Sequence, residues 1–388
     1  MILVFLEATL KNNPELIETA AFFHRKGLIE PNTYCIDLDM VINNTDKMAK
    51  VAQKSGIHLY FMTKQFGRNP IIARAIMQAG IKSAVAVDMD EARVLYRNGI
   101  KIGHMGHIVQ LPGTLLEEAI KMRPEVITCF SLEKALEINT VAEKLGVVQN
   151  ILLRVINNGD CMYPGQEGGI LLKELENVAS DIKKCKNVRL VGVTSFPCLL
   201  YNYDSGKIEL TPNLYTIVKS AQHLKQMGFE ISQVNAPSAT CISTIPLLKE
   251  IGATHGEPGH SLTGTTPLHS KGLEPEIPSM TYVTEVSHID KERTYVFGGG
   301  FYSRSRMQKA YLPARKLVLK AEDVSPESID YYTALETKGY NLPLGETVIY
   351  SFRTQIFVTR SKVAVIEGIH QGKPKILGIF NAIGDEIK

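Results

Sequence analysis

Short apolar runs alternate with segments of helical spacing from residue 58 to about residue 259, and this alternation constrains the fold of the 388-residue chain more than any other feature. The strand-like runs are HLYFM, KSAVAV, IGHMGHIV, EVITCF, NILLRVI, RLVGVTS, ISQVNA and ATHGEPG. Seven segments between them have apolar residues at helical intervals, and the fourth begins at a candidate N-cap, Ser131, and stops at Gly146. Strict alternation predicts a parallel sheet covered by helices, and eight units predict a closed (β/α)8 barrel, the TIM barrel of the α/β class.

The pattern changes near residue 272, where helical spacing gives way to short runs separated by turns. The strand-like runs there are TYVTEV, RTYVFGGG, KLVLK, GETVIYSF, QIFVTR and KVAVIEG. We therefore predict a helical lead-in over residues 1–30, with one amphipathic helix over residues 8–27. The barrel domain follows over residues 31–271, with a strand in TYCIDLDMV ahead of the barrel, and a smaller all-β domain over residues 272–388.

Composition excludes several classes of protein. The hydrophobic share of 44% and the charged share of 21% are ordinary for a globular protein, and a net charge of +3 without a dense basic block argues against nucleic acid and anionic membranes as partners. The apolar start, residues 1–6, is too short for a secretory signal or a membrane span. Six scattered cysteines without a CxxC pair predict reduced thiols and a cytoplasmic location.

The predicted strands end in polar residues, and in such barrels functional residues lie where strands end. These residues are Lys64, Arg154 with Asn157, Ser195, Asn235 with Ser238, and Glu257. Because all of these strand ends would meet at one mouth, Lys64 in YFMTKQFGRNP is a candidate reactive amine. Apolar walls disfavour the charged form of a lysine, so its pKa falls and it can attack a carbonyl.

An aldehyde cofactor, pyridoxal phosphate (PLP), would supply that carbonyl and needs a ring-nitrogen partner and phosphate donors from the protein. In GATHGEPGHSLTG, Glu257 is the candidate ring-nitrogen partner, and Gly259 lets backbone amides approach a phosphate. In NAPSAT, Ser238 and Thr240 come just before a predicted helix, where free N–H groups favour an anion. Each piece alone is also a common turn or helix cap, but together they predict a PLP site.

At these motifs the sequence resembles the fold-type III PLP enzymes, the group of alanine racemase and the ornithine and diaminopimelate decarboxylases, and within it the YhfX-like branch of racemase-like bacterial proteins. The resemblance covers nearly the whole chain: a lysine after the first barrel strand, LLRV, GVTSF, EPG at the last strand, then a β domain. It implies an obligate homodimer whose active sites form where one barrel meets the partner's β domain.

The resemblance also implies roles for particular residues. Lys64 matches the Schiff-base lysine, Glu257 the ring-nitrogen carboxylate of the decarboxylases, and Arg154 a strand arginine near the ring. Tyr302 in FGGGFYSRS resembles either the second catalytic base of the racemases or the β-domain tyrosines of the decarboxylases. The predicted cofactor-binding residues are Lys64, Arg154, Ser195, Asn235, Ser238, Thr240, Glu257, Gly259 and His260.

Three departures from the family pattern bear on the chemistry more than on the cofactor. His260 replaces the arginine of the decarboxylase EPGR motif, Ser195-Phe196-Pro197 replaces a ring-stacking histidine, and the β domain lacks a CDxxD-like signature. We predict an amino-acid racemase, an isomerase acting at Cα through an external aldimine, with Lys64 and the partner's Tyr302 serving opposite faces. Glu257 favours a strong electron sink, and so either decarboxylation or racemisation through a more stable carbanion, whereas the missing decarboxylase cysteine and the short β domain argue for a racemase. The alternatives are a PLP-dependent decarboxylase, another PLP reaction such as elimination, and a PLP-binding protein without catalysis, against which the β domain argues.

Histidines are the remaining candidates for chemistry. His288 and Asp290 form a His-x-Asp pair, but a metal site needs more ligands, so we predict no metal. We interpret His104 as a core histidine, whereas His107 and His255 are placed to reach the barrel mouth.

Overall fold

The computed structural model describes residues 5–290, 293–302, 305, 307–325, 327–337 and 339–388. The chain forms two compact units, one of residues 47–62 and 80–258 and the other of residues 1–46, 63–79 and 259–388. The predicted domain boundaries at residues 30 and 271 remain predictions. No helix among the described residues is long and apolar enough to cross a membrane.

The first unit contains a ring of parallel strands, which confirms the predicted barrel. In the described chain the ring has eight strands in the order β5-β4-β3-β2-β12-β11-β8-β6 and closes between β5 and β6. Their bounds are β2 (His58–Phe61), β3 (Ser83–Ala86), β4 (Ile102–Met105), β5 (Val126–Cys129), β6 (Gln149–Ile156), β8 (Val188–Thr194), β11 (Gln233–Asn235) and β12 (His255–Gly256). Each corresponds to one predicted apolar run.

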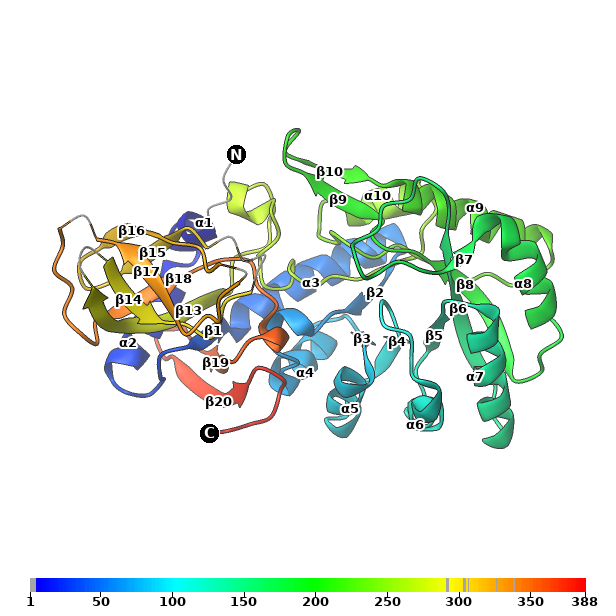
Figure 1. Cartoon of the computed structure of the whole chain (residues 1–388), viewed down its shortest axis with the longest axis horizontal. Helices are drawn as coiled ribbons and strands as arrows, with labels where there is room; N and C mark the ends of the chain where they lie inside the picture. Colours follow the sequence, from blue (N-terminus) through cyan, green and yellow to red (C-terminus); the bar gives the residue numbers. More distant parts are fainter. Residues whose placement is uncertain (1–4, 291–292, 303–304, 306, 326, 338) are drawn as a thin grey trace. The chain divides into compact units, whose positions relative to one another are not determined.

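The predicted helices also form between these strands. They are α4 (Pro70–Gln78), α5 (Met89–Arg97), α6 (Leu116–Lys121), α7 (Leu132–Lys144), α8 (Leu175–Ile182), α9 (Pro212–Gln226) and α10 (Ile245–Glu250). Helix α7 starts as predicted, because the Ser131 hydroxyl accepts from the Lys134 amide, and it is followed by Gly146 at φ +66°, a left-handed conformation that glycine adopts without strain. Helices α7, α8 and α9 lie on the outer side of β6 and β8 (Figure 1).

Two further pairs of short strands are present in this unit. A hairpin of β9 (Leu199–Asn202) and β10 (Lys207–Leu210) follows β8, and β7 (Ile170–Leu171) pairs with β6. The sequence pattern did not indicate these strands.

The second unit contains a largely antiparallel sheet, which confirms the predicted β domain. Its order is β14-β17-β16-β15-β18-β13-β1-β19-β20, with β14 also paired to β13, so that six strands close on themselves. The bounds are β1 (Thr33–Asp37), β13 (Met280–Asp290), β14 (Arg293–Phe297), β15 (Lys309–Leu312), β16 (Leu317–Ala321), β17 (Tyr332–Glu336), β18 (Thr347–Tyr350), β19 (Lys362–Glu367) and β20 (Lys375–Asn381).

Several expectations for this unit need correction. The lead-in is two helices, α1 (Phe5–Asn12) and α2 (Pro14–Arg25), because Pro14 and the capping side chain of Asn13 start a new helix. The run QIFVTR is a short 3-10 turn, η5 (Ile356–Val358), instead of a strand. The strand β1 pairs with β13 and β19 of the β sheet, and the long helix α3 (Leu38–Ser55) that follows it was not predicted.

Candidate active site

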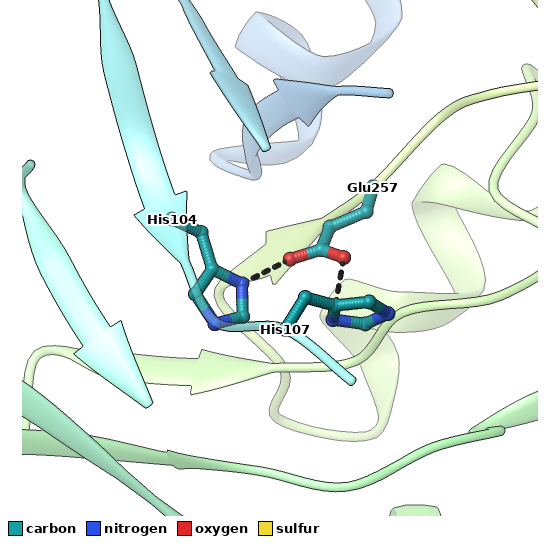
Figure 2. A group of neighbouring side chains, drawn as sticks. All are labelled: His104, His107 and Glu257. Atoms are coloured by element: carbon teal, nitrogen blue, oxygen red, sulfur yellow. Dashed lines mark hydrogen bonds and ion pairs between the residues drawn. The ribbon is translucent and has the colours of Figure 1, made fainter. Parts of the chain in front are cut away.

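Glu257 is the centre of a buried polar cluster at the carboxyl ends of the barrel strands (Figure 2). It follows β12 directly, and its Oε1 accepts hydrogen bonds from His104 Nδ1 at 2.6 Å and from Asn235 Nδ2 at 2.7 Å. Its Oε2 lies 3.0 Å from Nδ1 of His107, a residue of the loop after β4. The cluster therefore joins three strand ends, those of β4, β11 and β12.

Neighbouring hydroxyl groups fix this cluster in place. The Thr240 hydroxyl accepts from the amide of Glu257 at 3.1 Å, and the Thr128 hydroxyl lies 2.5 Å from His104 Nε2. Because Thr128 is on β5, the hydrogen bonds extend across a fourth strand. The His104 ring is thus held at both nitrogens, which fixes its orientation toward the carboxylate.

The electrostatics of the cluster favour an ionised carboxylate. Burial by itself raises the pKa of Glu257, but the positive potential of His107 and His104 and the hydrogen bonds from His104 and Asn235 outweigh it. The net effect lowers the pKa of Glu257 from 4.5 to about 2. Glu257 is therefore a charged acceptor at neutral pH.

The same cluster has the spacing of a metal site, which the sequence did not indicate. One donor atom each from His104, His107 and Glu257 lies within 4.8 Å of the others. Hydrogen bonds and charge also link these groups to one another, although Glu257 Oε2 and His107 Nδ1 form no hydrogen bond of good geometry. The His288 ring, by contrast, stacks on Tyr295 with 4.7 Å between centroids, on the β sheet. The prediction of no metal remains a prediction.

Lys64 comes three residues after β2, which is the neighbour of β12 in the barrel. The two segments leave the barrel together, since the Met62 amide donates to the Pro258 carbonyl at 2.9 Å. In the second unit Lys64 begins η1 (Lys64–Phe66) and is half-buried. Lys64 and Glu257 therefore follow two adjacent strands of the barrel, β2 and β12.

Basic groups gather around His260, the residue that replaces the arginine of EPGR. Burial lowers the pKa of His260 well below its usual value, and the nearby charges of Arg353 and Lys64 lower it further. Its Nε2 donates to the Thr354 carbonyl at 2.9 Å. Sequence reasoning missed Arg353, because it lies some 90 positions away in a run that reads as a strand. The two cations make this part of the second unit favourable for an anion.

The loop predicted to bind phosphate has an unusual backbone conformation, and the helix that follows it starts later than we predicted. Ser238 and Ala239 have φ of +93° and +46°, a region that non-glycine residues rarely adopt. The Ser238 hydroxyl donates to the Leu199 carbonyl at 2.7 Å. Helix α10 starts only at Ile245, so its free N–H groups do not follow Thr240 directly as we expected.

The other predicted site residues have well-defined surroundings. A Cβ on Gly259 would lie 2.5 Å from Gln65 Nε2, so a side chain here would displace the amide of Gln65. The Ser195 hydroxyl accepts from Asn213 Nδ2 at 3.2 Å. Tyr302 lines a cavity of about 360 Å³ in the second unit, with Phe301, Ser305 and Asp330. Part of the motif around Tyr302 (residues 303, 304 and 306) lies outside the described residues.

Of the predictions for the three barrel histidines, one agrees with the structure and two need revision. His107 does reach the cluster, as predicted. His255 instead stacks on His58 and Tyr60, with ring centroids 5.1 and 5.3 Å away. His104 is fully buried, but it is a partner of Glu257 and more than a core residue. The sequence did carry a signal for this pair: the spacing in GHMGH puts two histidines at one strand end.

Comparisons with known proteins agree with this architecture. A barrel of this kind followed by an antiparallel β domain defines the fold-type III class, in which PLP enzymes are typical. The family description "Alanine racemase, N-terminal domain" matches residues 36–267, and "YhfX-like, C-terminal domain" matches residues 281–376. The first match spans more than half of the chain, so the protein belongs to the alanine racemase-like family, in its YhfX-like branch.

Individual relatives support the same assignment. The chain is 40% identical over 388 residues to "Uncharacterized protein YhfX" of Escherichia coli K12, covering 99% of this chain and all of that one. Among solved structures, D-threonine aldolase from Filomicrobium marinum has a TM-score of 0.70 at 15% identity, covering 92% and 95% of the two chains. D-threo-3-hydroxyaspartate dehydratase from Delftia sp. HT23 has a TM-score of 0.66 at 14% identity, covering 92% of this chain and 98% of that one. Alanine racemase from Clostridium difficile 630 has 0.65 at 15%, covering 91% and 99%. Because these identities are low, the structures show a shared fold.

Proposed function

We propose that this protein is a PLP-dependent enzyme that acts at the Cα of an amino acid, most simply as a racemase. The observation that carries the proposal is the buried, ionised Glu257 at the end of β12, held by His104 and Asn235. A carboxylate in that state is suited to hold a protonated ring nitrogen, and Lys64 follows the adjacent strand.

The residues present fit the cofactor. Oε1 of Glu257 already accepts two hydrogen bonds, whereas Oε2 is buried and has no hydrogen bond of good geometry, only the charge of His107 at 3.0 Å. A ring N–H would satisfy that oxygen. Lys64 would hold the aldehyde carbon. The proposed phosphate ligands are Thr240 and the backbone amides of Ser238 and Gly259, and in the second unit the charges of Arg353 and Lys64 act on His260. We also assign Ser195, Asn235 and Arg154 to the walls of the site.

When bound, PLP supplies an aldehyde that condenses with amines and a ring that accepts electron density from Cα. The chain's own groups do the rest. Glu257 would keep a proton on the ring nitrogen, because an ionised carboxylate stabilises a positive charge beside it. The amine of Lys64 takes or returns a proton at one face of Cα, and the phenol of Tyr302 serves the opposite face.

The proposed assembly is a cytoplasmic homodimer in which the β domain of one subunit completes the neighbour's site with Tyr302. The β domain carries exposed large apolar side chains, as a domain that covers a partner's site would need. They include Ile329 (65% exposed), Tyr331 (59%) and Leu344 (68%). A two-fold pairing of identical surfaces is the simplest such assembly.

The similar folds include a racemase, an aldolase and a dehydratase, so one assay has to separate these reactions. The PLP-loaded protein is incubated in D₂O with a panel of D- and L-amino acids and followed by chiral chromatography and mass spectrometry. We expect inversion with deuterium at Cα. Release of CO₂, an aldehyde or ammonia instead would replace the racemase assignment with a decarboxylase, aldolase or dehydratase.

A further inference from the structure

Arg154 on β6 is a buried cation, and no acidic side chain of the described residues forms an ion pair with it. It is 1% exposed, and Nε and Nη1 are buried without hydrogen-bond partners. Nη2 donates to the backbone carbonyl of Gln166 at 2.5 Å. Within the described residues no carboxylate pairs with the guanidinium, because Glu167 acts on it only as a more distant charge.

An unpaired guanidinium in this position is costly. Moving an ion out of water is unfavourable when no counter-charge is present. The ring of Phe130 lies 4.8 Å from the guanidinium carbon, and this cation–π contact offsets part of that cost. An anion that accepts from the open N–H groups would offset this cost.

The loop after β6 covers the guanidinium of Arg154 and is held in place by several contacts. Gly169 lies so close that a Cβ there would be 2.9 Å from the Arg154 carbonyl oxygen. The loop is fastened to α9, since Asn213 accepts from the Cys161 amide at 2.8 Å and Thr216 donates to Asp160 at 2.8 Å. The burial of Arg154 thus depends on a fixed loop conformation.

The strand register connects Arg154 with the Glu257 cluster. Arg154 is level with Thr194 on β8, and Thr194 is level with Asn235 on β11. Two interstrand steps, roughly 10 Å, separate Arg154 from the residue that holds Glu257. In the ring order, β6 is four strands from β2, the strand that Lys64 follows, and therefore lies opposite it.

We infer that Arg154 binds the α-carboxylate of the amino-acid substrate. This inference rests on the proposed function and deepens it, because every α-amino acid carries that group whatever its side chain. The phosphate of the cofactor has other donors on other strands, which leaves the carboxylate as the anion for β6. The resemblance placed Arg154 near the cofactor ring, whereas its open N–H groups assign it to the substrate.

Two reagents test the inference without knowledge of the substrate. Aminooxyacetate and O-methylhydroxylamine both condense with the cofactor's aldehyde, but only aminooxyacetate carries a carboxylate. We would measure the rate at which each bleaches the visible absorption of the PLP-loaded protein, relative to its rate with free PLP. We expect aminooxyacetate to be favoured roughly 10- to 100-fold, the range expected of a hydrogen-bonded charge pair.

The variant Arg154→Met should lose this preference and Arg154→Lys should keep part of it. The matched control is Arg189→Met, because Arg189 lies on the adjacent strand β8, is exposed, and should retain the full preference. The cofactor-free protein gives an independent reading: malonate should raise the melting temperature of the wild type and of Arg189→Met, but not that of Arg154→Met.

Three outcomes would overturn the inference. The first is a wild-type protein without preference for aminooxyacetate, which needs no variant to fold. The second is an Arg154→Lys or Arg154→Met protein that retains the full preference. The third is an Arg154 variant whose visible PLP band is shifted while its preference for aminooxyacetate is intact. That result would make Arg154 a ligand of the cofactor. A protein that acquires no visible band with PLP overturns the proposed function itself, and is thereby distinguished from these results.

Discussion

The imidazole of His104 and the carboxylate of Glu257 are joined by a 2.6 Å hydrogen bond, and neither side chain is more than 1% exposed. Asn235 donates to the same oxygen, so the carboxylate is held in one orientation. This pair connects the barrel fold to the proposed chemistry, because it keeps a negative charge where burial alone would neutralise it.

Replacing the carboxylate of Glu257 should slow the chemistry and spare the fold. Glu257→Gln keeps the size of the side chain and loses the charge, so we expect reaction at Cα to fall by about 10²- to 10³-fold, as for other preorganised electrostatic groups. PLP binding should change little. The control is Glu125→Gln, a barrel carboxylate bonded to Tyr60 and Ser83. Equal losses in both variants would contradict a special role for Glu257.

Acid should destabilise the cofactor-free wild type more than Glu257→Gln. The folded-state pKa of Glu257, about 2, is below the ordinary 4.5, so the ionised group contributes stability above pH 4.5. That contribution is lost as the pH falls from 4.5 toward 2, and a shift of this size corresponds to about 3 kcal/mol. Urea unfolding of both proteins between pH 7 and pH 2.5 measures the difference. Parallel curves would mean that the carboxylate is not stabilised in the fold.

His104 and His107 should act through Glu257. His104→Phe removes a hydrogen bond to a charged group, and we expect a loss of about 1.5–3 kcal/mol in unfolding free energy. In the Glu257→Gln background the same substitution should cost clearly less, because the charged acceptor is gone. His107→Phe should show the same coupling more weakly, and the surface variant His223→Phe none. Full additivity for His104 would show that its role is packing alone.

Tyr302→Phe separates the two proton transfers of a racemase. Loss of one positioned base typically costs about 10² to 10⁴ in rate, so inversion should nearly stop. Exchange of the Cα hydrogen with D₂O should continue from the face that Lys64 serves, with retention of configuration. Tyr340→Phe, which alters an exposed tyrosine of the same domain, is the control. Unchanged inversion in Tyr302→Phe would remove that residue from the mechanism.

The local sequence pattern predicts the barrel well because each unit is a short, repeated signal. The run HLYFM and the segment NPIIARAIMQAG became β2 and α4 with their ends within a few residues. Long-range pairing is different. Strand β1 lies between β13 and β19, hundreds of positions further along the chain, and nothing in TYCID specifies those partners. The run QIFVTR has strand-like composition, but only Ile356 of its 3-10 turn is buried.

For the candidate site, the sequence shows which residues stand at strand ends but not where their side chains point. Glu257 and Asn235 follow from position alone, and the structure brings them together. His104 was interpreted as a core residue because burial and contact with a carboxylate produce the same apolar strand pattern. The proximity of Arg353 to His260 depends on tertiary structure, so no local motif could reveal it.

The most direct test of the central claim is reductive labelling of the cofactor amine. The full-length protein is incubated with PLP, reduced with borohydride, digested and analysed by mass spectrometry, with Lys64→Arg and Lys101→Arg as the variant and its control. The account predicts one pyridoxyl group on Lys64, which is lost in Lys64→Arg and retained in Lys101→Arg. A label on another lysine, or no stoichiometric label, would contradict it.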